Sequence, residues 1–375
     1  MPTSLRAALA AAIVVMLGSL PRIMLAAGTL PDALRPFVWS DALFVYQRGL
    51  SSHRLPYLDA PFEYPPLIGG ISALLSSLAN GPLVFVAAWA VLVALAAGAC
   101  AALLASVDAR ATWRYWVLAP QLLLLGTVNF DLIPALLMTV AVVTARARRD
   151  VIASTALALG AVAKFYPGAS APILIARSSN RLLATVVFTA TLLVAYLPTV
   201  FRPFSGAAGL GFYLVGIRAN LDSVWGSVER VLVGAGVPNA PLLVVVVTLV
   251  GLAVSYVALV VPRALRTADP ARAFCLTTVA LLLWSRLYSP QYSLWVLPFF
   301  VLLGVRGRVA ATLAVADVMV FFTIYPLTLV RWRDDDPLVI VLLSLLVAAV
   351  LLRHFALWRT WRAAWEDVVP VPLTR

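Results

Sequence analysis

Long apolar runs, separated by short segments rich in arginine, follow one another along the whole chain. A membrane span needs about 20 apolar residues to cross roughly 30 Å of hydrocarbon. The backbone polar groups of such a run must be satisfied within it, so each run predicts a membrane-spanning helix. The clearest runs cover residues 7–28, 82–105, 182–201, 238–262, 309–328 and 337–352.

Shorter apolar runs lie between the long ones and have the pattern of broken or paired helices. If all of them cross, and the proline-led run 65–79 does not, every basic cluster falls on one side of the membrane. Lys and Arg collect on the cytoplasmic side, so we predict about twelve membrane helices with both chain ends in the cytoplasm. The sequence leaves open whether 65–79 crosses. The shorter runs cover residues 115–128, 131–144, 151–165, 168–176, 273–288 and 290–305.

Composition supports this interpretation. The 375 residues are 63% hydrophobic and 12% charged, whereas soluble domains are roughly 45–50% apolar and about 25% charged. This balance excludes a cytosolic enzyme, a nucleic-acid-binding protein and a secreted disulfide scaffold. We expect an all-α, polytopic helical bundle, and we attribute the net charge of +12 to membrane orientation rather than to nucleic acid.

The segments between the runs suggest how the chain is organised. We predict one integral-membrane domain over 1–375, with outer loops at 29–64 and 202–237 and a cytoplasmic tail at 353–375. The predicted cytoplasmic loops are short and basic, too small to hold nucleotide chemistry. The chemistry is therefore expected at the outer face or within the membrane.

Acidic residues are concentrated in the first outer loop, and charged groups beside a membrane tend to be functional. Ser40 is a plausible N-cap for a short helix that ends near Gly49, with Asp41 in its first turn. Asp41 is our candidate catalytic base, and its alternative role is to cap that helix. Asp59 and Glu63 are further candidate acids.

Three basic residues are candidate ligands for a phosphate group. Lys164 is the only lysine of the chain and lies at the predicted outer end of a short span. It could bind phosphate as a point charge, or it could reach for the lipid headgroups as interfacial lysines do. Arg218 and Arg286 are its companions, since arginine can hold phosphate through two hydrogen bonds, although Arg286 could also reach for the headgroups.

Asp131 lies at the outer end of another short span. It could bind a sugar, hold a metal, orient a residue of the first loop, or cap a helix over 132–144. The chain has only two histidines, so we predict no metal site and no cofactor. Carboxylate oxygens could still hold Mg²⁺ or Mn²⁺.

Five sequence motifs follow one another between residues 38 and 300. The first motif combines Ser40-Asp41 with Pro56-Tyr57-x-Asp59 and Glu63-Tyr64-Pro65-Pro66. The others are Asn129-Phe130-Asp131-x-x-Pro134, Ala163-Lys164-Phe165-Tyr166-Pro167, Arg218 with Asp222-Ser223-x-Trp225, and Ser289-Pro290-Gln291-Tyr292 with Trp295. Together these motifs resemble those of the bacterial GT-C glycosyltransferases of family 87, which use polyprenyl-phosphate sugars.

The resemblance implies a helical bundle whose active site lies at the outer face beneath the first loop, with Asp41 as the general base. It also implies an inverting transfer of a sugar, mannose being our first choice, from a polyprenyl monophosphate to a cell-envelope glycolipid or glycan. The expected location is a bacterial plasma membrane. Candidate sugar- or acceptor-binding residues are Tyr57, Tyr64, Asn129, Gln291 and Tyr292.

Two alternatives remain at this point. An arabinofuranose donor would suit the same base and phosphate ligands. A lipid or sugar transporter would place broken helices and charge near the midplane and often shows inverted repeats, and no such repeat is evident in the sequence.

Overall fold

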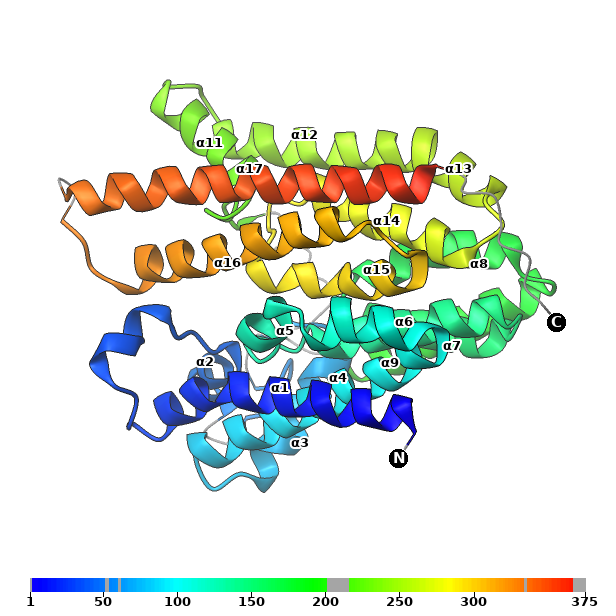
Figure 1. Ribbon diagram of the computed structural model, residues 1–375, viewed down its shortest axis with the longest axis horizontal. Helices are drawn as coiled ribbons and strands as arrows, with labels where there is room; N and C mark the ends of the chain where they lie inside the picture. The colour runs from blue at the N-terminus through cyan, green and yellow to red at the C-terminus, as the bar shows by residue number, and fades with distance from the viewer. Residues whose placement is uncertain (1, 51–53, 60–61, 201–215, 334–335, 367–375) are drawn as a thin grey trace.

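The computed structural model describes residues 2–50, 54–59, 62–200, 216–333 and 336–366. About 80% of the chain is helical, and the described residues form no strand. The all-α class predicted from the sequence is therefore confirmed. The helices run roughly along the long axis of the molecule (Figure 1).

Within the described ranges, six helical segments are long and apolar enough to cross a membrane, and they match the six long runs of the sequence. Few side chains of the α9 and α12 segments are buried, as expected of helices that face lipid. The six segments are α1 (Thr3–Ala26), α4 (Pro82–Thr112) with the π-helical turn η3 (Trp113–Val117), α9 (Arg181–Val200), α12 (Ala240–Ser255) with η5 (Tyr256–Val260) and α13 (Val261–Arg266), α16 (Gly307–Leu329) and α17 (Pro337–Trp365).

The shorter runs form shorter pieces than predicted. Helices of 14–15 residues, such as α6 and α7, span roughly 21–23 Å, less than the hydrocarbon thickness of about 30 Å. The predicted count of about twelve membrane helices is therefore not confirmed. These pieces are α3 (Pro66–Leu78), α5 (Pro120–Leu125), α6 (Leu132–Arg146), α7 (Asp150–Ala163), η4 (Tyr166–Ser170), α8 (Ala171–Arg177), α14 (Pro270–Trp284), η6 (Pro290–Trp295) and α15 (Leu297–Leu303).

Helix α1 begins and α17 ends at the same end of the molecule, which we call the terminal end; the opposite end is the loop end (Figure 1). Several of the basic segments predicted to share one side of the membrane meet at the terminal end. Arg146 forms an ion pair with Asp269 at 2.6 Å, Arg177 donates to the Ala264 carbonyl, and Arg272 donates to the Ala363 carbonyl near the end of α17.

Helix α17 continues well beyond the predicted tail boundary at residue 353 and ends only at Trp365. Arg353 is 1% exposed and lies over the ring of Tyr288. The arginine at the predicted boundary therefore has partners inside the bundle.

Two helical hairpins of opposite direction bring polar residues together inside the bundle. Helices α6 and α7 are joined by a turn at 147–149, so their open ends carry Asp131 and Lys164. Helix α14 and the pair η6–α15 are joined by the turn 285–289. The buried apolar side chains around them form one cluster that extends from α1 to α17.

The first loop folds as predicted in its central part. Helix α2 (Asp41–Arg48) follows η1 (Asp32–Phe37), and the Ser40 side chain accepts a hydrogen bond from the Leu43 amide at 3.2 Å. Gly49 follows the helix directly. This N-cap and the helix end near Gly49 were both predicted, and they fix Asp41 at the first position of the helix.

Candidate active site

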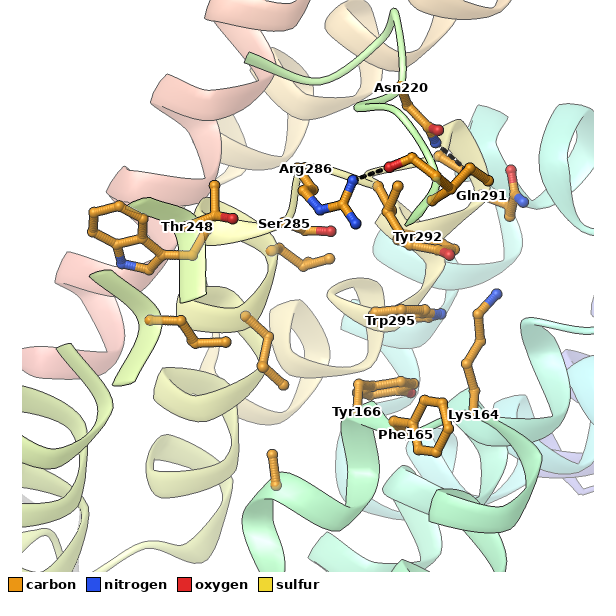
Figure 2. A pocket seen from close by; sticks show the side chains of 18 of the residues that line it. Lys164, Phe165, Tyr166, Asn220, Thr248, Ser285, Arg286, Gln291, Tyr292 and Trp295 are labelled. Carbon is orange, nitrogen blue, oxygen red and sulfur yellow. Dashed lines mark hydrogen bonds between the residues drawn. The ribbon is translucent and has the colours of Figure 1, made fainter. Parts of the chain in front are cut away.

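A cavity of about 570 Å³ lies between the first loop, the open end of the α6–α7 hairpin, the turn 285–289 and α12. Figure 2 shows side chains that point into it. Eight of the residues predicted from the sequence line this one cavity: Asp41, Glu63, Tyr64, Asn129, Lys164, Arg286, Gln291 and Tyr292.

Asp41 is held in place by groups on three sides. Its backbone amide donates to the Val128 carbonyl at 2.9 Å, and its carboxylate accepts hydrogen bonds from the Trp39 indole and from Asn129 Nδ2, the latter at 2.5 Å. Desolvation raises the pKa of Asp41 to about 6, while the Trp39 hydrogen bond and the charge of Lys164 act against the rise. A carboxylate with such a pKa is suited to accept a proton near neutral pH.

Asn129 connects Asp41 to the aromatic lining of the cavity. Its Nδ2 also lies 3.3 Å from the Tyr64 hydroxyl, and its Oδ1 accepts from the Phe130 amide at 2.7 Å. Since the amide oxygen is occupied by a backbone donor, the NH₂ group is the one directed at Asp41. Asn129 is 3% exposed, so this orientation is enforced by its surroundings.

Lys164 and Asp131 form a buried ion pair at the open end of the α6–α7 hairpin. Lys164 Nζ lies 2.7 Å from Asp131 Oδ1, which also accepts from the Trp295 indole at 2.7 Å. Asp131 occupies the N-cap position of α6, but its side chain makes no capping hydrogen bond and is bound to Lys164 and Trp295 instead. The Lys164 side chain is only 12% exposed and lines the cavity, which favours a binding role over that of a lysine reaching for the lipid headgroups.

Aromatic rings surround the Lys164 amine. Nζ lies 4.3 Å from the centroid of Tyr292 and 4.9 Å from that of Phe130. The Trp295 ring stacks between Tyr166 at 4.0 Å and Tyr292 at 4.1 Å (Figure 2). The rings lie within reach of the amine beside the cavity, so cation–π attraction supplements the ion pair.

Arg286 lies on the turn 285–289 and is 7% exposed, with its guanidinium donating to the Ile217 carbonyl. In Figure 2 the side chains of Tyr292 and Trp295 lie between Arg286 and Lys164. The cavity thus carries two cationic side chains from different elements. Such an arrangement can bind a phosphate, and the carboxylate of Asp41 can accept a proton in the same space.

Four predicted residues do not line the cavity. Tyr57 is 3% exposed and donates to the Tyr64 carbonyl, while Asp59 accepts from the Leu55 amide in an exposed turn. The Arg218 side chain is 75% exposed and lies 3.8 Å from Glu229. Asp131, the fourth, lies behind Lys164 and Trp295, which both line the cavity and bind its carboxylate.

The apolar wall of the cavity, formed by α12 and the end of α14, was not predicted from the sequence. Val245, Leu249 and Leu252 come from the long run 238–262, in which nothing distinguishes them from lipid-facing neighbours. Trp39 was not predicted either, although its position two residues before Asp41 was a usable signal. Within the described ranges, no three His, Cys, Asp or Glu side chains come together as a metal site would require.

Comparison with known proteins identifies a family. The model of glycosyltransferase family 87 matches residues 62–290, more than half of the chain. The matched range contains Asn129, Lys164 and Arg286 but begins after Asp41. Searches of curated proteins and of solved structures gave no match.

Proposed function

The chain belongs to glycosyltransferase family 87, and from this membership and the cavity we propose that it transfers mannose from a polyprenyl monophosphate to a cell-envelope glycolipid or glycan. The observation that carries the proposal is the meeting of Asp41, Lys164 and Arg286 in one cavity that has an apolar wall. Each of these features matches one part of the substrates: the acceptor hydroxyl, the phosphate and the lipid.

The apolar wall supports a lipid-linked donor. Leu249 of α12 lines the cavity and is itself 56% exposed, so the wall continues onto the outer surface of the helix. A prenyl chain could lie along this surface in the bilayer while its phosphate enters the cavity. Burial of apolar surface contributes roughly 25 cal/mol per Å², which favours a long hydrocarbon donor over a water-soluble nucleotide sugar.

The proposed reaction is a single displacement at the anomeric carbon. Asp41 takes the proton of the acceptor hydroxyl as its oxygen attacks, and the bond from the anomeric carbon to the phosphate oxygen breaks with its electron pair leaving on that oxygen. The attack comes from the face opposite the leaving group, so the configuration inverts. The product is a glycoside, and the lipid phosphate departs as an anion.

Lys164 and Arg286 would stabilise the charge that develops on the departing phosphate. Fixed positive groups in a cavity of low dielectric act strongly on such charge because they need no rearrangement during the reaction. Asp131 and the stacked rings hold Lys164 in place. Glu63, Tyr64, Gln291 and Tyr292 remain for the sugar and the acceptor.

We further propose that the whole chain is one membrane domain in a bacterial plasma membrane, with the terminal end in the cytoplasm and the cavity open to the outer face. The gathering of arginines at the terminal end supports this orientation. The first loop, which carries Asp41, continues toward the loop end (Figure 1).

The test is to reconstitute the full chain in liposomes and supply radiolabelled polyprenyl-phosphate-mannose with an envelope lipid extract. The expected result is a labelled glycolipid or glycan in which the anomeric configuration of the transferred sugar is opposite to that in the donor. A parallel sample with polyprenyl-phosphate-arabinofuranose decides between the two donors. Movement of labelled donor across the bilayer without product would instead identify a transporter, and absence of product with both donors would reject the proposal.

A further inference from the structure

The segment Ile217–Ser223, which we call the wall segment, is tied to the turn 285–289 beside the cavity. The Asn220 amide and the Ser223 hydroxyl both donate to the carbonyl of Arg286, at 2.9 and 3.0 Å. Asn220 Nδ2 donates to Ser289 Oγ at 3.0 Å, and the Arg286 guanidinium donates back to Ile217. Segment and turn therefore hold the Arg286 guanidinium between them (Figure 2).

A single buried arginine of α17 contacts both pieces from behind. Arg353 donates to the Asp222 carbonyl of the wall segment, and its guanidinium carbon lies 3.9 Å from the ring centroid of Tyr288 in the turn. It is 1% exposed and does not line the cavity. Its contacts therefore lie behind the cavity and not in it.

Asp317 of α16 accompanies Arg353, with 3.9 Å between the closest charged atoms. The Asp317 carboxylate accepts from Gln121 at 3.0 Å and from Ser293 at 2.8 Å, and the Ser293 hydroxyl lies 2.8 Å from that of Tyr288. The network thereby links α5, α16 and α17 to the turn. A charge pair that is 1% exposed on both sides is expensive in a membrane chain and tends to be retained for function.

The position of Arg353 explains why the wall segment needs this support. Arg353 lies sixteen residues after the start of α17, which corresponds to roughly 24 Å along the helix. The wall segment lies beside it and is mostly non-helical: the Ser223 amide donates to the Asn220 carbonyl within the segment, but the Asn220 amide depends on the Arg286 carbonyl outside it. Non-helical backbone at membrane depth is stable only where protein groups or a water-filled cavity satisfy it.

We propose that Arg353 is a positioning residue for glycosyl transfer: it holds the wall segment against the turn 285–289 and so fixes Arg286 at the cavity. The inference rests on the proposed function, because Arg286 is there assigned to the donor phosphate. Arg353 acts through Arg286 and touches no substrate.

A double-mutant cycle tests the link in the reconstituted full chain. Arg353→Met should lower kcat about tenfold, and Arg353→Lys should recover part of the loss, because an ammonium keeps the charge but not the planar stacking on Tyr288. In a protein that already carries Arg286→Gln, Arg353→Met should lower kcat by less than about a further twofold, because the effects of coupled residues are not additive. If Arg353→Met lowers kcat by the same factor with and without Arg286→Gln, the two residues act independently and the proposal is overturned.

Hydrogen exchange of residues 217–223 supplies a readout that does not depend on activity. Arg353→Met should speed exchange of the Asn220 and Ser223 amides about tenfold or more, whereas Arg359→Met, at an exposed position of the same helix, should not. Unchanged exchange in Arg353→Met would overturn the proposal. Should this variant fail to fold, Asp317→Asn/Arg353→Met removes both charges and is read in the same way.

The transfer assay and the hydrogen-exchange measurement together separate this proposal from the proposed function. If the wild type transfers no sugar from either donor, the proposed function fails, and exchange alone then decides whether Arg353 holds the wall segment. If transfer occurs but exchange is unchanged in the variant, only the role of Arg353 fails.

Discussion

Asp41 and Lys164 come from elements far apart in sequence, and each has partners that fix it at the cavity. Asp41 is held by Trp39 and Asn129, and Lys164 by Asp131. Asp41, Lys164 and Asp131 were candidates because charged residues are rare in so apolar a chain, and Asn129 was a candidate through the family resemblance, whereas Trp39 was not predicted. It could not predict the pairing of Lys164 with Asp131, which depends on how α6 and α7 fold back on each other.

The pH dependence of transfer follows from the position of Asp41. Its pKa is raised to about 6, and a general base must be ionised to accept a proton. The kcat/KM should therefore be constant above about pH 7 and fall about tenfold per unit below pH 6. A profile that stays flat down to pH 5 would contradict the assignment of Asp41 as the base.

The ion pair of Lys164 and Asp131 predicts a stability effect of defined sign. Lys164→Met leaves the 1%-exposed Asp131 carboxylate without its cation, which should lower the free energy of unfolding by about 3–5 kcal/mol. Asp131→Asn/Lys164→Met should recover most of this loss, because no buried charge remains. Thermal unfolding in detergent measures both variants, and an unchanged midpoint for Lys164→Met would show that the pair does not stabilise the fold.

At the scale of elements, hydropathy predicted where helices occur better than how they are divided. The run 115–128 is the end of one helix and the short α5, with Pro120 at the first position of α5. The run 290–305 is a 3₁₀ turn followed by α15. Such breaks depend on the neighbours that satisfy the freed backbone groups, and these neighbours are distant in sequence.

Close packing of α1 against α5 gives a prediction at this scale. Gly18 of α1 lies against the Leu123 carbonyl, and a Cβ added there would collide with backbone. Small residues allow membrane helices to approach closely, so Gly18→Ala should lower the thermal midpoint by several degrees.

Gly70→Ala in α3 is the matched control for Gly18→Ala. Its added Cβ would meet nothing within 4 Å, and alanine favours a helix over glycine. The midpoint of this variant should be unchanged or slightly higher. An equal fall of the thermal midpoint in Gly18→Ala and Gly70→Ala would show that close packing at Gly18 is not the cause.

For the whole molecule, the sequence predicted an all-α membrane chain whose basic segments share one end. The structure adds that three helices too short to cross, α6, α7 and α14, each have one end beside the cavity. The count of twelve membrane helices assumed that every apolar run crosses. Hydropathy does not show how far a helix extends across the membrane, so it could not separate helices that cross from those that end inside the bundle.

Cysteine labelling in intact cells tests the proposed orientation. Cys100 and Cys275 are both fully buried, so an introduced cysteine dominates the signal. A membrane-impermeant maleimide should label Arg35→Cys in the exposed part of the first loop before permeabilisation. It should label Arg149→Cys, in the α6–α7 turn, only afterwards. The reverse order would place the cavity on the cytoplasmic side.

The most direct test of the central claim is glycosyl transfer by Asp41→Asn, measured beside Asp59→Asn and Glu63→Gln in the same liposomes. The amide keeps the shape of the side chain but cannot take the acceptor proton. In Asp41→Asn the kcat should fall at least about a thousandfold at unchanged expression, while Asp59→Asn should keep nearly full activity. Full activity in Asp41→Asn, with loss in Glu63→Gln or Asp59→Asn instead, would show that Asp41 is not the base.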